Sequence, residues 1–383
     1  MKKILFITHV GDPGGAEHVM IRLCEPVKDT SEILLFQNGT MEEILKDKGV
    51  DVSVCPMPDN MKSFKKKNGV IAALRAVPAT LSMIRKVASK CKEFDVIVCM
   101  SQKSFVIASL AKPLMRKPII WCMNDILSED HFSKFLIKAL VNISKYSANH
   151  VVLNSQASLD AWNNAGGKNN VTVMYPGSDV QGFDEQLQDQ DAVASYKNKF
   201  SPDGSPLVGI FGRISPWKGQ DVFLKSLARL ENVRAVIVGG ALFGEEDYEA
   251  SLKELAKDLG IEDRVIFAGH VTDVAKVMAS CDIVAHCSTS PEPFGLVIVE
   301  AMLSRIPVVA TNAGGAKEIV LHGETGQLTP ISDVAALSDA IDKYLNNPEW
   351  MINVVESARK RAVEEFSADI MNNKFAKIVN NVS

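Results

Sequence analysis

Two glutamates, Glu292 and Glu300, flank a short stretch that reads Pro-Glu-Pro-Phe-Gly-Leu-Val-Ile-Val-Glu from Pro291 onward. Proline is tolerated at the start of a helix but not inside one, so this stretch predicts a turn and then a helix beginning near Phe294 or Gly295. Helical spacing places Glu300 beside the open amides of the first turn, while Glu292 lies just ahead of the positive helix end. The arrangement suits a ligand with an anion held at the helix and hydroxyl groups on either side.

A second loop offers positive charge. The stretch Gly209–Gly219 follows a predicted buried strand and presents Arg213 and Lys218 before a helix expected near Gln220. Arginine supplies a rigid fork of donors and lysine a mobile point charge, so the two can neutralise a diphosphate. Loop cations are most often simply solvated. We favour binding because open α/β sheets bind ligands at the carboxyl ends of their strands. A sugar joined through a diphosphate to a ribose would fit both loops.

Two further turns are rich in glycine. Gly11–Glu17 follows the first predicted strand, where glycines let backbone amides approach a phosphate. It lacks the Gly-x-Gly-x-x-Gly pattern, which argues against a nicotinamide-dependent oxidoreductase, and a plain tight turn is the alternative. Ala313–Glu318 repeats the theme, and it either adds amides near the same ligand or only turns the chain.

These loops need a scaffold, and the patterns predict an α/β fold. Segments that resemble buried strands alternate with helical patterns, which is typical of a parallel sheet covered on both faces. In the first half the predicted strands are Ile4–Thr8, Ile33–Phe36, Val52–Cys55, Val96–Cys99, Ile119–Cys122, His150–Leu153 and Val171–Met174. In the second half they are Leu207–Phe211, Ala235–Val238, Val265–Ala268, Ile283–Cys287 and Val308–Ala310. Each set is sufficient for one doubly wound domain.

The length also predicts two domains, because 383 residues exceed what one core usually holds. We place the join between about Gly177 and Ser205, where Gln, Asp and Asn are frequent, and assign the domains to residues 1–180 and 181–359. The first 180 residues hold 23 Lys and Arg against 17 Asp and Glu, and the remainder holds 19 against 29. This asymmetry fits two domains with different partners.

Composition favours a cytoplasmic protein. The seven cysteines have no Cys-x-x-Cys spacing, which indicates reduced thiols. No apolar run approaches the roughly 20 residues that span a bilayer, and we interpret the N-terminus as a strand rather than a signal peptide. The histidines lack the paired spacing of a metal site, and no Gly-x-Ser-x-Gly elbow indicates an acyl nucleophile. In the basic segment 61–67, four lysines surround Phe64, so it could rest on an anionic membrane or be a solvated loop.

The motifs together resemble a known family. Pro291–Met302, Ile306–Thr311 and Gly314–Val320, preceded in order by Gly14–Glu17 and by Phe211–Gly219, are similar to the glycogen synthase-like, family 4 retaining glycosyltransferases. The likeness covers nearly the whole chain. It implies a GT-B fold, in which two facing Rossmann-like domains enclose an interdomain cleft and the second domain holds the donor. It also implies that a C-terminal helix, about 360–383, packs back on the first domain.

The resemblance assigns roles to single residues. Arg213 and Lys218 would bind the donor diphosphate and stabilise the leaving nucleotide, Glu292 would bind sugar hydroxyls, and Glu300 would bind the ribose. Backbone contacts with the donor are implied for Gly15, Val271, Phe294, Gly295 and Leu296. The family works with retention and commonly without a metal, by front-side displacement or through a short-lived ion pair.

Two positions depart from the family pattern. Many relatives carry a histidine where this chain has Asn124 followed by Asp125, and that histidine touches the transferred sugar. Asparagine can bond a hydroxyl but cannot carry a proton, so a proton shuttle at this position is in doubt. Leu296 stands where close relatives often carry arginine, so the resemblance assigns its side chain no contact with the phosphate or the acceptor.

The expected function is therefore transfer of a hexose, with retention, from a nucleotide-diphosphate sugar such as UDP-glucose to a glycan or lipid-linked glycan in polysaccharide or glycolipid assembly. We expect no metal or cofactor, no nucleic-acid partner, and a cytoplasmic location with peripheral contact to the inner membrane face through 61–67. A nucleotide-sugar epimerase of the same fold is one alternative. A non-catalytic binding subunit is another, although a decayed site usually loses one or more of the charged residues present here.

Overall fold

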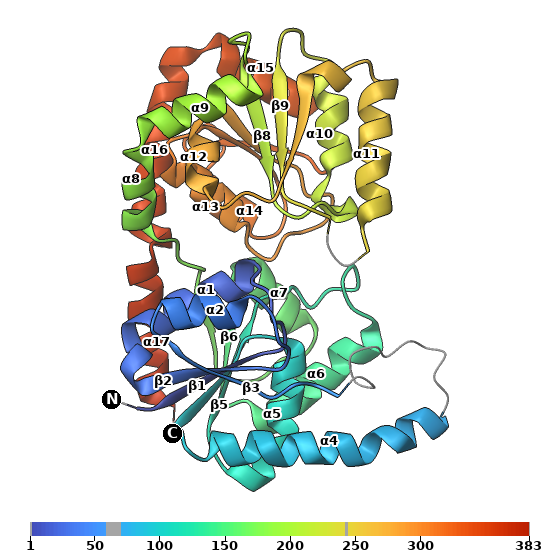
Figure 1. The fold of residues 1–383 in the computed structure, drawn as a ribbon, viewed down its shortest axis with the longest axis vertical. Helices are drawn as coiled ribbons and strands as arrows, with labels where there is room; N and C mark the ends of the chain where they lie inside the picture. The colour runs from blue at the N-terminus through green and yellow to red at the C-terminus, as the bar shows by residue number, and fades with distance from the viewer. Residues whose placement is uncertain (1, 59–69, 242–243, 383) are drawn as a thin grey trace. The chain divides into compact units, whose positions relative to one another are not determined.

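The computed structural model describes residues 2–58, 70–241 and 244–382, and the chain forms two compact units (Figure 1). The first unit is Met1–Gly177 together with Ala368–Ser383, and the second is Ser178–Ser367. Each unit holds one fully parallel sheet with helices on its faces, so the predicted doubly wound α/β fold is confirmed. The basic segment 61–67 lies outside the described residues.

The first sheet has its earliest strand near the centre, as in doubly wound folds. Its order is β3 (Asp51–Val54), β2 (Ser31–Leu35), β1 (Ile4–Thr8), β4 (Val96–Cys99), β5 (Ile119–Met123), β6 (His150–Leu153) and β7 (Val171–Val173). The central strands β1, β4 and β5 are buried throughout, whereas the edge strands β3 and β7 are at most half-buried. Continuous apolar runs form these central strands because helices cover both faces.

Helices of the first unit divide between the two faces of its sheet. They are α1 (Gly15–Cys24), η1 (Glu25–Thr30), α2 (Met41–Asp47), α4 (Val70–Cys91), α5 (Gln102–Met115), α6 (Lys134–Ser147), α7 (Gln156–Asn164) and α17 (Ala368–Asn381). Buried residues of α4, α5, α6 and α7 pack with Leu5 and Ile7 on one face. On the other face, Phe375 of α17 stacks on Phe6 with ring centroids 5.8 Å apart, and α17 contacts α1.

The second sheet repeats the pattern. Its order is β10 (Val265–Gly269), β9 (Arg234–Val238), β8 (Leu207–Phe211), β11 (Ile283–His286), β12 (Val308–Thr311) and β13 (Gln327–Thr329). Each strand predicted from the sequence is present, with ends that differ by no more than two residues. The short strand β13 was not predicted, because three residues with polar ends carry no apolar run.

Helices of the second unit are α8 (Val180–Leu187), α9 (Gln190–Phe200), η2 (Pro216–Lys218), α10 (Gln220–Leu227), α11 (Glu246–Asp258), η3 (Glu262–Arg264), α12 (Val274–Ala279), α13 (Leu296–Leu303), α14 (Ala316–Ile319), α15 (Val334–Asn346) and α16 (Pro348–Phe366). The polar stretch that we interpreted as the join is largely occupied by α8 and α9. The division between the units falls at the very start of this stretch, between Gly177 and Ser178.

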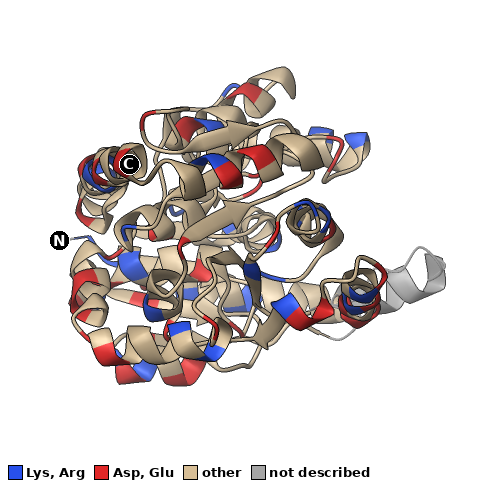
Figure 2. Cartoon of the chain, turned by 90° about the horizontal axis from the view of Figure 1, so that it is seen from above, with Lys and Arg blue, Asp and Glu red and all other residues tan. Residues whose placement is uncertain are grey.

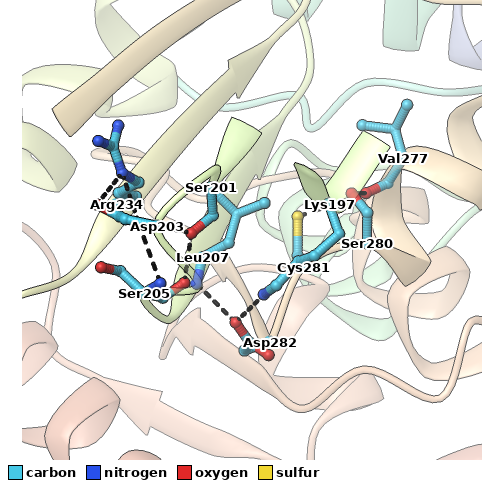
Figure 3. A network of polar contacts seen from close by, with 10 residues as sticks. All are labelled: Lys197, Ser201, Asp203, Ser205, Leu207, Arg234, Val277, Ser280, Cys281 and Asp282. Atoms are coloured by element: carbon cyan, nitrogen blue, oxygen red, sulfur yellow. Dashed lines mark hydrogen bonds and ion pairs between the residues drawn. The ribbon is translucent and has the colours of Figure 1, made fainter. Parts of the chain in front are cut away.

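Polar contacts fix the amino ends of three strands in the second sheet (Figure 3). Asp282, ahead of β11, accepts a hydrogen bond from the Leu207 amide at 2.6 Å and pairs with Lys197 of α9. Asp203, in the loop before β8, pairs with Arg234 of β9 at 2.9 Å. These contacts lie at the edge opposite the loops singled out in the sequence, so we assign them to folding.

The expected C-terminal helix is broken in two. One helix was expected over about 360–383, but α16 ends at Phe366 and α17 begins at Ala368, with Ser367 extended between them. The Ser178 amide donates to the Phe366 carbonyl at 2.8 Å, which satisfies an open carbonyl at the end of α16. Residues 360–366 therefore belong to the second unit, and the segment on the first unit begins at Ala368 rather than near 360.

Candidate active site

The singled-out residues of the second unit follow the carboxyl ends of neighbouring strands. β8 and β11 are adjacent in the sheet, and the strand order reverses between them, so their following loops leave in opposite directions. Open α/β sheets bind ligands in the crevice at such a switch point. Arg213 and Lys218 follow β8, Glu292 follows β11, and Val271 follows β10, on the same edge of the sheet.

Glu292 is at the centre of a buried polar cluster. One carboxylate oxygen, Oε1, pairs with Lys218 Nζ at 2.5 Å. The other, Oε2, lies 2.8 Å from His286 Nε2 and accepts a hydrogen bond from Ser288 Oγ at 2.6 Å. Glu292 is only 9% exposed, so its charge is balanced by protein groups more than by water.

The electrostatics of the cluster favour an ionised carboxylate. Burial works to raise the pKa of Glu292, but the charges of Lys218 and His286 and their hydrogen bonds outweigh burial and hold that pKa well below its ordinary value. The Lys218 ammonium also lies 4.2 Å from the ring centroid of Trp217, a cation–π contact that restrains the lysine. The site thus presents a fixed negative charge beside a fixed positive one.

The backbone at Glu292 is held by the glycine pair of the following loop. The Gly315 amide donates to the Glu292 carbonyl at 2.8 Å, and a Cβ at Gly314 would lie 2.2 Å from that same oxygen. A Cβ at Gly315 would lie 2.5 Å from Cα of Phe294. Of the two readings that the sequence left open for Ala313–Glu318, the described contacts favour a supporting turn, because a larger residue could not fit.

Helix α13 begins at Leu296, one or two residues later than expected. Gly295 precedes it with φ of +109°, a conformation that side chains with a Cβ rarely adopt. Leu296, Val297 and Glu300 are half-buried, whereas most of the rest of the helix is fully buried. Glu300 therefore lies on the accessible face of α13 beside its first turn, as the spacing predicted.

The loop after β8 carries the two cations on a braced backbone. Gln220, at the start of α10, donates from Nε2 to the Arg213 carbonyl at 3.0 Å. Lys218 ends the short helix η2, and the amide of Thr289 donates to the Trp217 carbonyl at 2.8 Å. This last bond ties the β8 loop to the β11 loop, which brings Lys218 to Glu292 across 74 residues of sequence.

In the first unit, Gly15 is the first residue of α1. Glu17 caps that helix: its Oε2 accepts from the Gly14 amide at 3.1 Å and its Oε1 from the Thr8 hydroxyl at 3.2 Å. Burial raises the pKa of Glu17, although both hydrogen bonds act in the opposite direction. Gly15 is thus placed at the carboxyl edge of the first sheet by the helix cap.

Asn124 and Asp125 follow β5 at the same edge of the first sheet. Asn124 donates from Nδ2 to the Met100 carbonyl at 3.0 Å. The backbone carbonyl of Asn124 accepts a hydrogen bond from Nδ2 of Asn154 at 3.1 Å. Asp125 accepts a hydrogen bond from Gln102 of α5. The loops after β4, β5 and β6 are therefore cross-linked through amide side chains.

Sequence reasoning missed two residues of the cluster, His286 and Ser288. The histidines were judged only by metal-ligand spacing, and within the described residues no three His, Cys, Asp or Glu side chains gather in a way that would hold a metal ion. The available signal was position: a histidine ending a buried strand, with a serine two residues later and a glutamate six residues later.

Comparison with known proteins identifies the family. Residues 194–361 match the model of a family described as glycosyl transferases group 1. HepE of Anabaena, solved in complex with UDP and glucose and also with UDP-glucose, is 34% identical, and the match covers 100% of both chains in the first complex with a TM-score of 0.90. The chain belongs to the group 1 glycosyl transferases. Its two-unit fold is accordingly the predicted GT-B fold.

Curated relatives match this group 1 glycosyl transferase over shorter stretches. D-inositol 3-phosphate glycosyltransferase of Stackebrandtia nassauensis is 35% identical over 189 residues, which is 46% of this chain and 41% of that protein. Lipopolysaccharide core biosynthesis mannosyltransferase LpcC of Rhizobium leguminosarum is 31% identical over 202 residues, 52% of this chain and 56% of that protein. The match thus spans about half the length of these relatives. Among the described helices, none combines the length and apolar character needed to cross a bilayer.

Proposed function

We propose that this transferase moves a hexosyl group, with retention, from a nucleotide-diphosphate sugar to a glycan or lipid-linked glycan. UDP-glucose is the expected donor, and the complexes of the 34% identical HepE with UDP and glucose support it. The observation that carries the proposal is the buried Lys218–Glu292 pair at the switch point of the second sheet. The pair supplies a cation, Lys218, for the diphosphate and a carboxylate, Glu292, for the sugar hydroxyls beside it.

In the proposed reaction, the donor diphosphate becomes the partner of Lys218 and Arg213. As the bond between the anomeric carbon and the diphosphate oxygen breaks, negative charge develops on the departing nucleotide, and the two fixed cations stabilise it. Glu292 stays ionised and accepts hydrogen bonds from sugar hydroxyls, oriented by His286 and Ser288. In the proposed reaction, no side chain of this cluster forms a covalent intermediate, and departure of the nucleotide and attack by the acceptor take place on the same face of the sugar.

The remaining site residues hold the ends of the donor. Glu300, on the accessible face of α13, accepts hydrogen bonds from the ribose hydroxyls. The backbone of Phe294, Gly295 and Leu296 lies against the sugar and the phosphate. Val271, after β10, contacts the base through its backbone. Gly15 offers its amide to the diphosphate, and Asn124 and Asp125 contact the transferred sugar or the acceptor.

The acceptor and the location complete the proposal. A glycan or a lipid-linked glycan fits a role in polysaccharide or glycolipid assembly at the inner face of a membrane, with the lysines of 61–67 near anionic lipid. The chemistry proposed here uses fixed cations and amides, and it needs neither a metal nor a cofactor.

A donor panel tests the proposal. Thermal unfolding is measured with UDP-, GDP- and ADP-glucose, since a ligand at a hundred times its dissociation constant adds about 2.7 kcal/mol of stability. Product formation on pooled lipid-linked glycans is then followed by mass, and the anomeric configuration by NMR. Lys218→Met is compared with Lys253→Met, which alters an exposed ion pair on α11. Absence of any nucleotide effect, or equal activity of the two variants, would contradict the proposal.

The same assay separates the alternatives. An epimerase would convert the sugar without an acceptor-dependent product. A binding subunit would show the nucleotide-dependent rise in stability but no turnover with any acceptor. An inverted anomeric configuration in the product would remove retention while leaving the transfer itself in place.

A further inference from the structure

Three neighbouring helices of the first unit contain no acidic residue. The sequences of α4, α5 and α6 together include no Asp or Glu, but they include Arg75, Arg85, Lys86, Lys90, Lys103, Lys112, Lys134, Lys138 and Lys145. In the view of Figure 2, Lys and Arg lie among Asp and Glu over much of the chain. The positive charge of these helices therefore favours binding to a negatively charged partner.

The same helices carry exposed apolar side chains. Of the eleven large apolar residues that are exposed in the described part of the chain, six lie here: Leu81, Leu110, Leu114, Phe135, Leu136 and Tyr146. Phe135 is 82% exposed and Tyr146 is 86% exposed, the two highest values among them. Burial of these two rings in an apolar medium would remove a large apolar area from water. A helix face that contacts only water does not explain why such large apolar side chains are exposed there.

These residues lie on the outward sides of helices that pack against one another. The buried sides of α4, α5 and α6 pack on one face of the first sheet, and α5 contacts both of its neighbours (Figure 1). The opposite sides therefore point away from the sheet. On α6, Phe135, Lys138, Asn142 and Tyr146 follow one another at helical spacing and are all exposed.

Some of the lysines are already engaged within the protein. Lys90 pairs with Glu32 at 2.8 Å, Lys134 pairs with Glu129 at 3.1 Å, and Lys112 donates to the Ser147 carbonyl at 2.7 Å. Five further cations on these helices are exposed: Arg85, Lys86, Lys103, Lys138 and Lys145. Of these, Lys145 donates to Oδ1 of Asn142 on the same helix at 3.1 Å, and Lys103 is close enough to His9 for its charge to lower the pKa of that histidine. The exposed surface thus combines positive charge with aromatic and aliphatic side chains.

We infer that the outward surface of α4, α5 and α6 docks on an anionic lipid bilayer. Lysine is depleted in the core of protein interfaces, whereas lysine next to exposed Phe, Tyr and Leu is the pattern of helices that lie in the headgroup region. Cations would approach anionic headgroups while the rings enter the boundary of the acyl chains. The surface would lie on the membrane without crossing it. This inference stands apart from the donor chemistry, because it involves other residues.

Vesicle binding tests the inference. The full chain is mixed with vesicles of phosphatidylcholine alone or with about a third of phosphatidylglycerol, and bound protein is measured by co-sedimentation at low and high salt. Each cation near the surface contributes about a fivefold change in partitioning, so Lys138→Ser with Lys145→Ser should lower binding about twenty-fivefold. Phe135→Ser with Tyr146→Ser should lower binding even at low salt. High salt should weaken the native chain because it screens the lysines.

Matched controls guard against trivial results. Ile352→Ser with Lys360→Ser changes an exposed apolar residue and an exposed lysine on α16, and should leave vesicle binding unchanged. Unaltered thermal unfolding confirms that each variant is folded. A variant with Lys62→Ser, Lys65→Ser, Lys66→Ser and Lys67→Ser tests the basic segment 61–67.

Three outcomes would overturn the inference. One is equal binding to neutral and anionic vesicles by all variants. Another is loss of binding only when the lysines of 61–67 are changed. The third is a concentration-dependent dimer, seen by light scattering, that the α6 variants abolish while vesicles bind nothing, which would assign the surface to a second copy of the chain.

Discussion

Each sheet carries a buried carboxylate at its carboxyl edge, and the two carboxylates are stabilised in opposite ways. Glu17, in the first unit, is 8% exposed and Glu292, in the second, is 9% exposed. Glu17 is bonded to a hydroxyl and an amide, and burial raises its pKa. At Glu292 burial acts in the same direction, but a lysine and a histidine overcome it and the pKa is lowered.

The difference shows that burial alone does not decide the state of a carboxylate. The same topology positions both residues, so the neighbouring charges make the distinction. Glu17 accepts the hydrogen bond of the Gly14 amide at the start of α1 and thereby places the Gly15 amide. Glu292 holds the Lys218 ammonium, and in the proposed reaction the donor diphosphate recruits that cation while the Glu292 carboxylate accepts hydrogen bonds from sugar hydroxyls. One edge therefore uses its carboxylate for structure, and the other has the charge arrangement of a reaction site.

Glu292→Gln should give the largest effect. Glutamine keeps the size of the side chain but removes the charge that pairs with Lys218 and that, in the proposed reaction, accepts hydrogen bonds from the sugar hydroxyls. Turnover with UDP-glucose should fall about a hundredfold, the usual result of losing one electrostatic group worth about 3 kcal/mol in the barrier. Affinity for UDP should change much less. Steady-state kinetics and calorimetry measure the two quantities.

Glu249→Gln is the control for this variant, because it changes an exposed ion pair on α11. It should leave turnover and affinity unchanged. If Glu292→Gln turned over donor as fast as this control, the charge of Glu292 would have no role in the reaction, and the two sheet edges would not differ in function.

The scaffold was predictable because it depends on local pattern. Strands such as Ile4–Thr8 and Leu207–Phe211 are apolar runs buried on both faces, and their observed bounds are those predicted. The end of α16 was not predictable, because helical periodicity continues through Ser367. Its break depends on Ser178, which is distant in sequence and pairs with Ser367 in a parallel bridge.

The same division applies to the site. The positions of Glu292 and Glu300 around a helix start follow from proline and glycine preferences within ten residues. The partner of Glu292 does not, because Lys218 lies 74 residues earlier and meets it only through adjacent strands. His286 was missed for the same reason, since its role depends on facing a carboxylate rather than on spacing to other metal ligands.

Glu300→Gln should affect binding instead of turnover. Loss of a charged acceptor for the ribose hydroxyls costs about 2 kcal/mol, or roughly thirtyfold in affinity for UDP. Turnover at saturating donor should remain close to that of the native chain. Titration with UDP and with 2′-deoxy-UDP measures the effect, and the difference between the two ligands should shrink in the variant. An undiminished preference for the ribonucleotide would exclude Glu300 as the ribose contact.

His286→Ala should lower turnover about tenfold, the equivalent of one charge-assisted hydrogen bond to Glu292. His286→Gln keeps an amide that can donate to Oε2 and should recover most of the activity. UDP affinity should be similar in both, since the histidine acts through the glutamate. Equal loss in the two variants would indicate that His286 only fills space.

The smallest effect is expected in the pH dependence of stability. The pKa of Glu17 is raised, so its contribution to the free energy of unfolding is fully present at acidic pH and is lost as pH rises through its pKa in the folded state. The stability of Glu17→Gln relative to the native chain should therefore increase as pH rises. The pKa of Glu292 is lowered, so its contribution to the free energy of unfolding is present above the pKa of about 4.3 in the unfolded chain and is lost on acidification. The stability of Glu292→Gln relative to the native chain should therefore decrease as pH rises. Denaturant unfolding between pH 3 and 8 measures both trends. Trends of the same sign would mean that the two carboxylates do not differ as their neighbours indicate.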